Sequence, residues 1–173
     1  MSSFKAFAYL YNDDREIRGN VMFTQQKGRN RVMISIMAAI EELKPKLKNQ
    51  TTVVKRYHGF HIHKSGDMSR GCASMGPHYN PEFQDHGGRS SKVRHVGDMG
   101  NVRSDNGYID TTFYLDNPGF SLDPDHERTI VGRGVVLHMD RDDCGKGNDK
   151  ESKITGNSGA RIMCGPIFQV FSM

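Results

Sequence analysis

Short stretches in which apolar and polar residues alternate recur along the whole chain. Such alternation is typical of strands with one buried face, and it predicts strands over residues 4–11, 16–24, 31–39, 57–64, 93–102, 108–115, 130–138 and 161–171. In the third of these, Val32, Ile34 and Ile36 fall on one face. Turn-forming residues at 12–14 and 27–30 separate the first three strands. About eight short strands predict an all-β domain, either a sandwich or a barrel.

Three long connections interrupt this succession of short strands. Residues 65–92 are rich in Gly, Ser, His and Pro, and residues 139–160 are rich in Gly, Asp, Lys and Asn. Long loops are usually functional or disordered, and these two contain or border nearly all the candidate chemistry, so we interpret them as functional. Residues 40–56 carry Pro45 and many charges, and we expect them to form a surface insertion with a helical turn at 40–44.

The length of 173 residues and the hydrophobic content of 35% suit one domain that spans residues 1–173. No apolar run approaches the roughly 20 residues that a membrane helix needs. Residues 1–5 lack the apolar core of a signal peptide, and we therefore expect a cytoplasmic protein. The net charge of +4 also fits a nucleic-acid-binding protein, but no zinc-finger spacing or aromatic–basic signature accompanies it.

The chain has three cysteines, Cys72, Cys144 and Cys164. Disulfides are uncommon in the cytoplasm, so free thiols are the default expectation for a cytoplasmic protein. Composition alone does not pair the three residues.

Most of the histidines lie in one part of the chain, and two of them form the sequence His61-Ile62-His63 within a predicted strand. Residues two apart in a strand point to the same side. Phe60 and Ile62 would then face the core, while His61 and His63 would project together from the other face. Two imidazoles presented in this way fit a shared metal ion, although an H-x-H sequence by itself is also common on ordinary surface strands.

Further candidate ligands follow. His78, His86 and His95 are spaced by eight and nine residues, with Asp98 three residues later, and such a set suits tetrahedral Zn²⁺. His138 ends a predicted strand. Together with His61 and His63, these residues make seven possible ligands. Two four-coordinate ions need eight ligand positions, one more than this number. The count therefore suggests two ions that share one imidazole. An all-nitrogen set favours Cu(II), and the set with the carboxylate is then the zinc site.

Several longer motifs also follow one another in a characteristic order. They are Gly59-Phe60-His61-Ile62-His63, Gly71-Cys72, Gly76-Pro77-His78-Tyr79-Asn80-Pro81, His86-Gly87-Gly88, Arg94-His95-Val96-Gly97-Asp98-Met99-Gly100-Asn101, Gly132-Arg133, Val136-Leu137-His138, Asp142-Asp143, Gly145-Lys146-Gly147, Gly156-Asn157-Ser158-Gly159-Ala160-Arg161 and Cys164-Gly165. In this order they resemble the copper/zinc superoxide dismutase family. The resemblance covers residues 57–165 strongly and residues 4–39 only through the strand pattern. It implies an eight-stranded Greek-key β-barrel or sandwich, immunoglobulin-like, with two long functional loops.

The resemblance implies the ligands of both ions. Copper would be held by His61, His63, His78 and His138, and zinc by His78, His86, His95 and Asp98. His78 would then be the shared imidazole. Asp142 would be a carboxylate outside the ligand set that ties His61 to His86 and fixes the orientation of both rings.

The activity that the resemblance implies is the disproportionation of superoxide to O₂ and H₂O₂, by cycling of copper between Cu(II) and Cu(I) beside a structural zinc. Arg161 would hold the superoxide anion, and His78 would donate a proton to the nascent peroxide. Lys153 and Arg161 would steer the anion to the site. Cys72 and Cys164 would form an intrachain disulfide, an exception to the cytoplasmic rule. The family resemblance further implies a homodimer.

The chain departs from the family pattern at several positions. Lys64 and Ser65 stand where the family usually has an acidic residue and an aromatic residue of the dimer contact. Ile154 stands where the steering lysine of the family is expected. In a C-terminal tail that also differs, Phe168 and Phe171 fit either an interface or the core, and we expect the core.

A non-enzymatic copper-binding or copper-delivery protein on the same fold is the alternative function. Such relatives often lose copper ligands or the active-site arginine, whereas this chain keeps all four copper histidines and Arg161, which favours the enzyme. A nucleic-acid-binding protein, suggested by charge alone, would show a steep salt dependence of affinity. Cys144 is expected to be a free thiol, and His58 and His126 lie outside the ligand set.

Overall fold

A computed structural model describes residues 4–26, 29–36, 53–116 and 118–170. The helical turn expected at 40–44 and most of the expected insertion at 40–56 lie outside the described residues, as do residues 27–28 of the second expected turn and Phe171. The side chains of Ile34 and Ile36 also lie outside the described part. Among the described residues, no helix has the length and apolar character needed to cross a membrane.

The described residues form strands and two single 3₁₀ turns. The strands are β1 (Phe4–Tyr11), β2 (Ile17–Gln26), β3 (Arg29–Ile36), β4 (Lys55–His63), β5 (Ser69–Cys72), β6 (Asp98–Asp105), β7 (Asp110–Asp116), β8 (Gly134–His138), β9 (Arg161–Pro166) and β10 (Phe168–Val170). The 3₁₀ turns are η2 (Ala73–Met75) and η3 (Glu151–Lys153). Every strand predicted from the sequence therefore has a counterpart, and β5 was not predicted.

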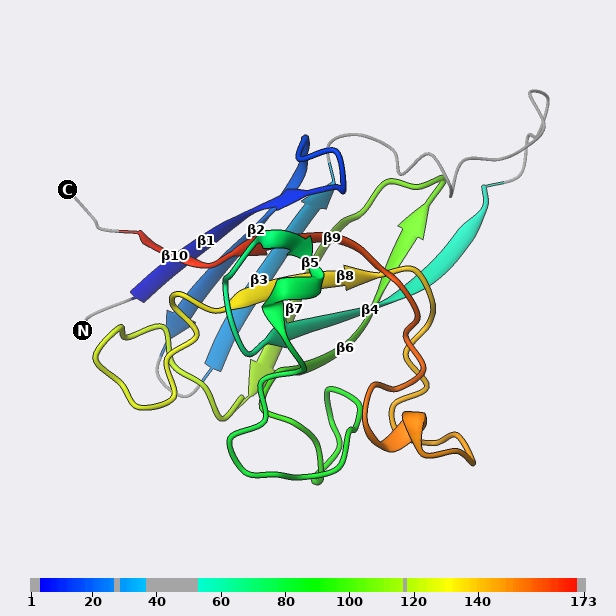
Figure 1. Cartoon of the computed structure of the whole chain (residues 1–173). Coiled ribbons are helices and arrows are strands. Elements are labelled where there is room, and N and C mark those ends of the chain that lie inside the picture. The colour runs from blue at the N-terminus through cyan, green and yellow to red at the C-terminus, as the bar shows by residue number, and fades with distance from the viewer. Residues whose placement is uncertain (1–3, 27–28, 37–52, 117, 171–173) are drawn as a thin grey trace.

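Eight of the strands follow one another in the antiparallel order β6-β4-β8-β9-β1-β2-β3-β7, and β10 pairs with β1 (Figure 1). The two end strands, β6 and β7, are consecutive in the chain and are joined by a tight turn closed by the Asp105–Tyr108 bridge. This turn brings the two ends of the sheet together, so the sheet curls into a nearly closed barrel. The expected all-β, eight-stranded architecture is confirmed.

The core lies inside the barrel and follows the alternation of the strands. Ala6, Ala8 and Leu10 of β1 are fully buried, as are Phe60 and Ile62 of β4. Each fully buried large apolar side chain contributes about 1.5–3 kcal/mol to stability. The predicted inward orientation of Phe60 and Ile62 is thus confirmed.

Several strand boundaries differ from the sequence-based expectation. The strand expected at 93–102 begins only at Asp98, because the preceding residues form turns. The strand expected at 130–138 begins at Gly134. The strand expected at 161–171 is interrupted at Ile167, whose backbone N–H bonds to the carbonyl of Arg133 instead of continuing the ladder. In the first two cases an apolar pattern continued into turns, and in the third it continued through one buried residue between two strands.

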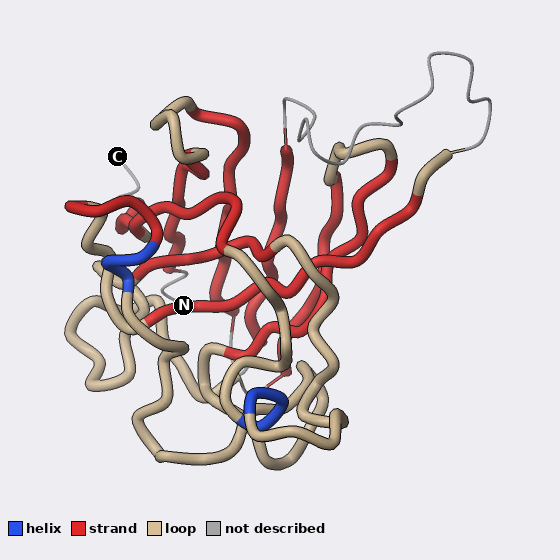
Figure 2. Tube along the Cα trace, turned by 45° about the vertical axis from the view of Figure 1, so that its right-hand side comes forward, coloured by secondary structure: helices blue, strands red, loops and turns tan. Residues whose placement is uncertain are grey.

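Much of the loop structure gathers on one side of the strands (Figure 2). Both long loops contact β4, since the N–H of Tyr79 bonds to the carbonyl of Ile62 and the N–H of Gly59 bonds to the carbonyl of Asp140. Cys72 and Cys164 form a disulfide with a Cα–Cα distance of 5.6 Å, and this bond fastens the first loop to β9. The pairing that the family resemblance implied is therefore present. An ion pair between Glu82 and Arg128 also links the first loop to the connection before β8.

Candidate metal centre

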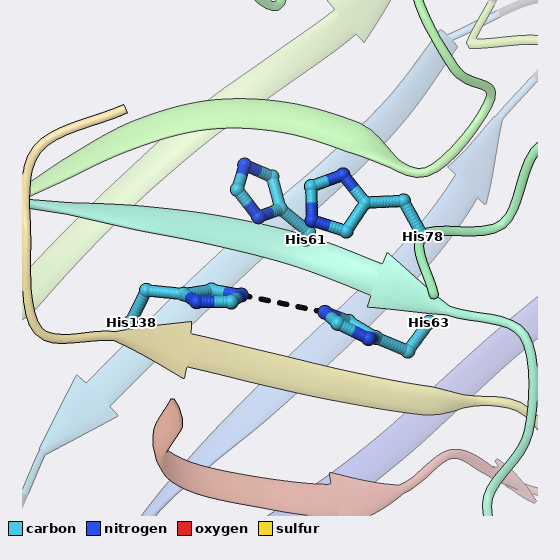
Figure 3. Close-up of side chains that lie close together, drawn as sticks. All are labelled: His61, His63, His78 and His138. Carbon is cyan, nitrogen blue, oxygen red and sulfur yellow. Dashed lines mark hydrogen bonds between the residues drawn. The ribbon is translucent and has the colours of Figure 1, made fainter. Parts of the chain in front are cut away.

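Four histidines from three segments converge beside the barrel wall (Figure 3). His61 and His63 project from β4, opposite Val136 and Gly134 of β8, and His138 ends β8. His78 joins them from the first loop, where it forms an isolated bridge with His63. One ligand atom from each ring lies within 4.8 Å of the others.

A second group lies next to the first. It contains His78, His86, His95 and Asp98, with ligand atoms again within 4.8 Å of one another. Asp98 begins β6, where it pairs with His61 of β4, and this pairing fixes the spacing of the two groups. Its Oδ1 lies 3.0 Å from Nδ1 of His78 and 3.2 Å from Nδ1 of His95, and its Oδ2 lies 3.0 Å from Nδ1 of His86.

Hydrogen bonds fix which nitrogen of each ring faces the centre of its group. Nδ1 of His63 lies 2.8 Å from the carbonyl of Gly76, and Nδ1 of His138 lies 3.1 Å from the carbonyl of Gly159. Because a carbonyl only accepts, these Nδ1 atoms carry the protons, and Nε2 is left as the ligand atom. The two Nε2 atoms lie 3.3 Å apart (Figure 3).

Both groups contain a buried nitrogen without a hydrogen-bond partner, Nδ1 of His61 in the first and Nδ1 of His86 in the second. Nδ1 of His86 is close to Asp98 but does not meet the geometry of a hydrogen bond. Unpaired buried polar atoms are rare because leaving them unsatisfied costs about 1–3 kcal/mol each. An ion in each group would satisfy them, so the residues present fit two metal ions.

His78 is the one residue that belongs to both groups. Its Nδ1 faces Asp98 in the second group, which leaves Nε2 for the first. A single imidazole can bind two ions when it gives up both N–H protons. The count of seven groups for eight ligand positions thus corresponds to the geometry, with His78 as the shared ligand.

The chain matches the family model described as copper/zinc superoxide dismutase over residues 17–167. It is 44% identical over 169 residues to the extracellular superoxide dismutase [Cu-Zn] of Drosophila melanogaster, covering 94% of this chain and 84% of that protein. It is 42% identical to the superoxide dismutase [Cu-Zn] of Schizosaccharomyces pombe, covering 94% and 96%. The crystal structure of the clock protein EA4 superposes with a TM-score of 0.77 at 40% identity, covering 95% and 93%.

The chain belongs to the copper/zinc superoxide dismutase family. The first group is accordingly the copper site and the second is the zinc site. The chain is an enzyme that disproportionates superoxide, and the alternative of a non-enzymatic copper-delivery protein is not supported, since no copper ligand is missing.

In this superoxide dismutase, Asp142 connects the two sites. Its Oδ2 accepts a hydrogen bond from Nε2 of His61 at 2.9 Å, and its Oδ1 accepts one from Nε2 of His86 at 2.8 Å. The protons on Nε2 leave Nδ1 of each ring free to bind a metal. One carboxylate therefore orients a copper ligand and a zinc ligand together.

Two residues to which the sequence analysis gave no role hold Asp142 in place. The side-chain amide of Asn101 donates to the carbonyl of Asp142 and accepts from its backbone N–H, both at 2.8 Å. Gly156 has a φ of +66°, and a Cβ there would lie 2.1 Å from Oδ1 of Asp142 and 2.4 Å from Nε2 of His86. Only glycine fits that close approach. Both residues lie within sequence motifs typical of the family, but only the fold shows which atoms they contact.

Burial and charge set the protonation of the ligands. Burial lowers the pKa of His61 to about 3 and that of His138 to about 4, and it holds the pKa of His63 well below its ordinary value. Burial also lowers the pKa of His86, but the hydrogen bond to Asp142 and the nearby carboxylate of Asp98 outweigh this effect and raise it to about 9. The copper site therefore presents neutral imidazoles, the form that binds metal ions.

The carboxylate of the zinc site is held in its ionised form. Burial by itself would raise the pKa of Asp98, but hydrogen bonds from His78 and His95 and the adjacent ring of His86 lower it far below its ordinary value. The same balance applies to Asp142, whose pKa is also lowered by its two imidazole partners despite burial. A permanent negative charge at Asp98 suits a divalent ion.

A cavity of about 520 Å³ opens in front of the copper site and is lined by His63, His78 and His138. Arg161 lies at its wall, because β9 pairs with β8 so that Arg161 is opposite His138. Its guanidinium donates to the carbonyls of Cys72 at 2.8 Å and Gly76 at 2.7 Å. The disulfide-bonded loop thus holds the arginine beside the copper ligands.

Other residues named from the sequence lie outside this cavity. His58 is buried, with its Nδ1 donating to the carbonyls of His138 and Met139, so it has a structural role. His126 is exposed. Cys144 is a free, half-buried thiol, as expected.

Proposed function

We propose that superoxide is attracted, held and protonated in the cavity in front of His63 and His138, with Arg161 as the anion-binding residue. The position of Arg161 carries this proposal, because a half-buried cation shares the cavity wall with three copper-site imidazoles. Copper bound by the first group supplies the one-electron exchange by which two superoxide anions and two protons give O₂ and H₂O₂. The residues of the chain bring the anion and the proton to that place.

The guanidinium of Arg161 is well suited to this task. It offers five N–H donors, and the carbonyls of Cys72, Ala73 and Gly76 occupy only part of them. Burial lowers the pKa of Arg161 from its ordinary value, but a guanidinium remains charged at neutral pH. The remaining donors are then available to hold a small anion in a fixed orientation.

His78 is the proposed proton donor. It lines the same cavity, and its Nε2 faces the copper group while its Nδ1 faces Asp98. A proton held at Nε2 therefore lies next to the place from which peroxide, the two-electron-reduced form of O₂, is released. His78 donates this proton to the product, and the second proton comes from solvent.

Replacing Arg161 with alanine should lower kcat/KM about tenfold or more and leave copper and zinc content unchanged. The physical reason is the loss of the only cationic side chain that lines the described cavity. The rate is measured as inhibition of superoxide-driven cytochrome c reduction, and metals are measured by mass spectrometry. Arg103→Ala is the charge-matched control, since Arg103 is exposed and pairs with Asp105 far from the cavity. A parallel fall in metal content and activity would contradict the role of Arg161.

The predicted steering role of Lys153 stays a prediction. Its Nζ donates to the backbone carbonyl of Gly145, so the ammonium is tied to the loop. Ile154 and Glu151 line the cavity instead. Lys153 would therefore attract the anion only over a distance, where salt screens its charge.

Replacing Ile154 with lysine should raise kcat/KM at low ionic strength by about two- to fivefold, because it places a cation at the cavity wall and partly offsets Glu151. The gain should shrink as salt is added, since the screening length falls to about 8 Å at 0.15 M. The measurement is the rate as a function of ionic strength. Ile154→Gln is the uncharged control, and an equal gain with glutamine would show that charge is not the cause.

A homodimer remains the proposed assembly. In support, Phe168 of β10 is 54% exposed, which corrects the expectation that it lies in the core. It pairs in register with Phe7 of β1, and Phe7 packs edge to face with Tyr9, itself 42% exposed. Exposed aromatic clusters are typical of interfaces. Sedimentation equilibrium of the full chain tests this proposal, and a monomer mass at micromolar concentration would contradict it.

A cytoplasmic location is likewise a proposal. The similar enzyme of Drosophila melanogaster is extracellular, so relatives do not decide the location. Cell fractionation followed by detection with a specific antibody tests it. Recovery of the protein from the medium would contradict it.

A further inference from the structure

A second groove, of about 490 Å³, opens on the zinc side of the metal centre. Two of the four zinc ligands, His78 and His95, line it, and they are only 6% and 5% exposed. The other two, His86 and Asp98, are 3% and 0% exposed. This groove therefore gives solvent access to the zinc site from a side that is separate from the copper-site cavity. His78 lines both the groove and the cavity.

The groove carries positive charge. Lys64 and Arg133 line it, and no carboxylate of the described residues does. Lys64 follows the copper ligand His63 directly, at the position where the family usually has an acidic residue. The charge of the groove is thus a property of this chain.

Arg133 is fixed in the groove, whereas Lys64 is exposed at its edge. The guanidinium of Arg133 stacks on the ring of Tyr79 at 3.7 Å and donates to the carbonyls of Thr129 and Lys64. The side chain of Lys64 is exposed. Two cations that line the same groove form a small anion-binding site.

The rim of the groove is apolar and held in shape. Phe83 is 92% exposed with a φ of +54°, in a turn that Asn80 closes by hydrogen bonds to both the carbonyl and the N–H of Gln84. Ile154, 54% exposed, also lines the groove as well as the copper-site cavity. Apolar walls around two cations strengthen their attraction for an anion.

We propose that Lys64 and Arg133 bind a small polycarboxylate that would carry zinc into and out of its site through this groove. A free Zn²⁺ ion approaches two positive charges and is repelled. A polycarboxylate is attracted, and its oxygens would replace His95, one of the two zinc ligands that line the groove. Exchange of zinc would then require no movement of His86 and Asp98, the two zinc ligands that do not line the groove.

The test measures the transfer of zinc from the loaded protein to two chelators at low ionic strength, followed as zinc in the small-molecule fraction by mass spectrometry. EDTA is a polycarboxylate, and TPEN is an uncharged polypyridine. Lys64→Glu should slow the transfer to EDTA about three- to tenfold and change the transfer to TPEN little. The slowing should diminish with added salt.

Lys55→Glu is the matched control. Lys55 lies at the opposite end of β4, is exposed, and undergoes the same change of charge. Equal EDTA rates in the two variants would overturn the proposal. So would an equal slowing of EDTA and TPEN transfer in Lys64→Glu, because that pattern reports a change in zinc affinity. Zinc content, measured before the chelator is added, separates a failure of the zinc site from a failure of this inference.

Discussion

Replacing His78 with glutamine should lower dismutase activity by more than 100-fold and reduce both the zinc and the copper content of the purified protein. His78 is the one ligand that belongs to both groups, so its loss leaves each ion with three ligands. Glutamine fills the space but cannot bind two ions. Loss of a partner outside the ligand set already costs about 10–100-fold in metal affinity or activity, and loss of a shared ligand should cost more.

His63→Gln separates the shared role from a simple ligand role. His63 belongs only to the copper group, so this variant should lose copper and activity but keep zinc. His126→Gln, at an exposed position outside both groups, should keep both metals and full activity. If His78→Gln lost copper but retained a full equivalent of zinc, His78 would not be the shared ligand.

Replacing Cys72 with serine should lower the free energy of unfolding of the metal-free protein by about 4–5 kcal/mol. The disulfide to Cys164 spans 92 residues, and closure of a loop of that length restricts the unfolded chain by about this amount in the chain-entropy model. The measurement is a urea or guanidinium titration of metal-free protein. The same variant should also lower activity in the metal-loaded protein, because the carbonyl of Cys72 accepts a hydrogen bond from Arg161.

Cys144→Ser is the matched control for this prediction. Cys144 is a free thiol in the second long loop, and its replacement should change stability by less than about 1 kcal/mol. A loss of stability in Cys72→Ser no larger than in the control would show that the disulfide does not hold the barrel together. Cys164→Ser should reproduce the Cys72→Ser result, since either change removes the same bond.

The alternation of apolar and polar residues was sufficient to predict how side chains are oriented within a single strand. The alternation in residues 57–64 correctly placed Phe60 and Ile62 inward and His61 and His63 on the other face, because side chains alternate along any strand. It did not show that the second face is also buried, since the cover comes from loops distant in the chain. The break at Ile167 was missed for a similar reason, because it depends on hydrogen bonding to Arg133.

The metal ligands were accessible from the sequence because their chemistry is rare and their spacing is characteristic. The residues that hold them were less accessible. Asn101 is one asparagine among several, and its two hydrogen bonds to Asp142 cross 41 positions of the chain. Lys153 had the charge expected of a steering residue, yet its ammonium bonds to Gly145. Charge and residue type are written in the sequence, but the direction of a side chain depends on its neighbours in space.

Sequence alone was sufficient to predict the fold class, the set of seven metal-binding groups and, through its motifs, the family. These features depend on short-range periodicity and on residue types that few other proteins combine in this order. Only the tertiary structure showed that Asp142 reaches one ligand of each metal, that Arg161 is fastened by the disulfide loop, and that Lys64 gives the zinc side a cationic groove. Those features arise from contacts between segments far apart in the chain, and such contacts exist only once the barrel has closed.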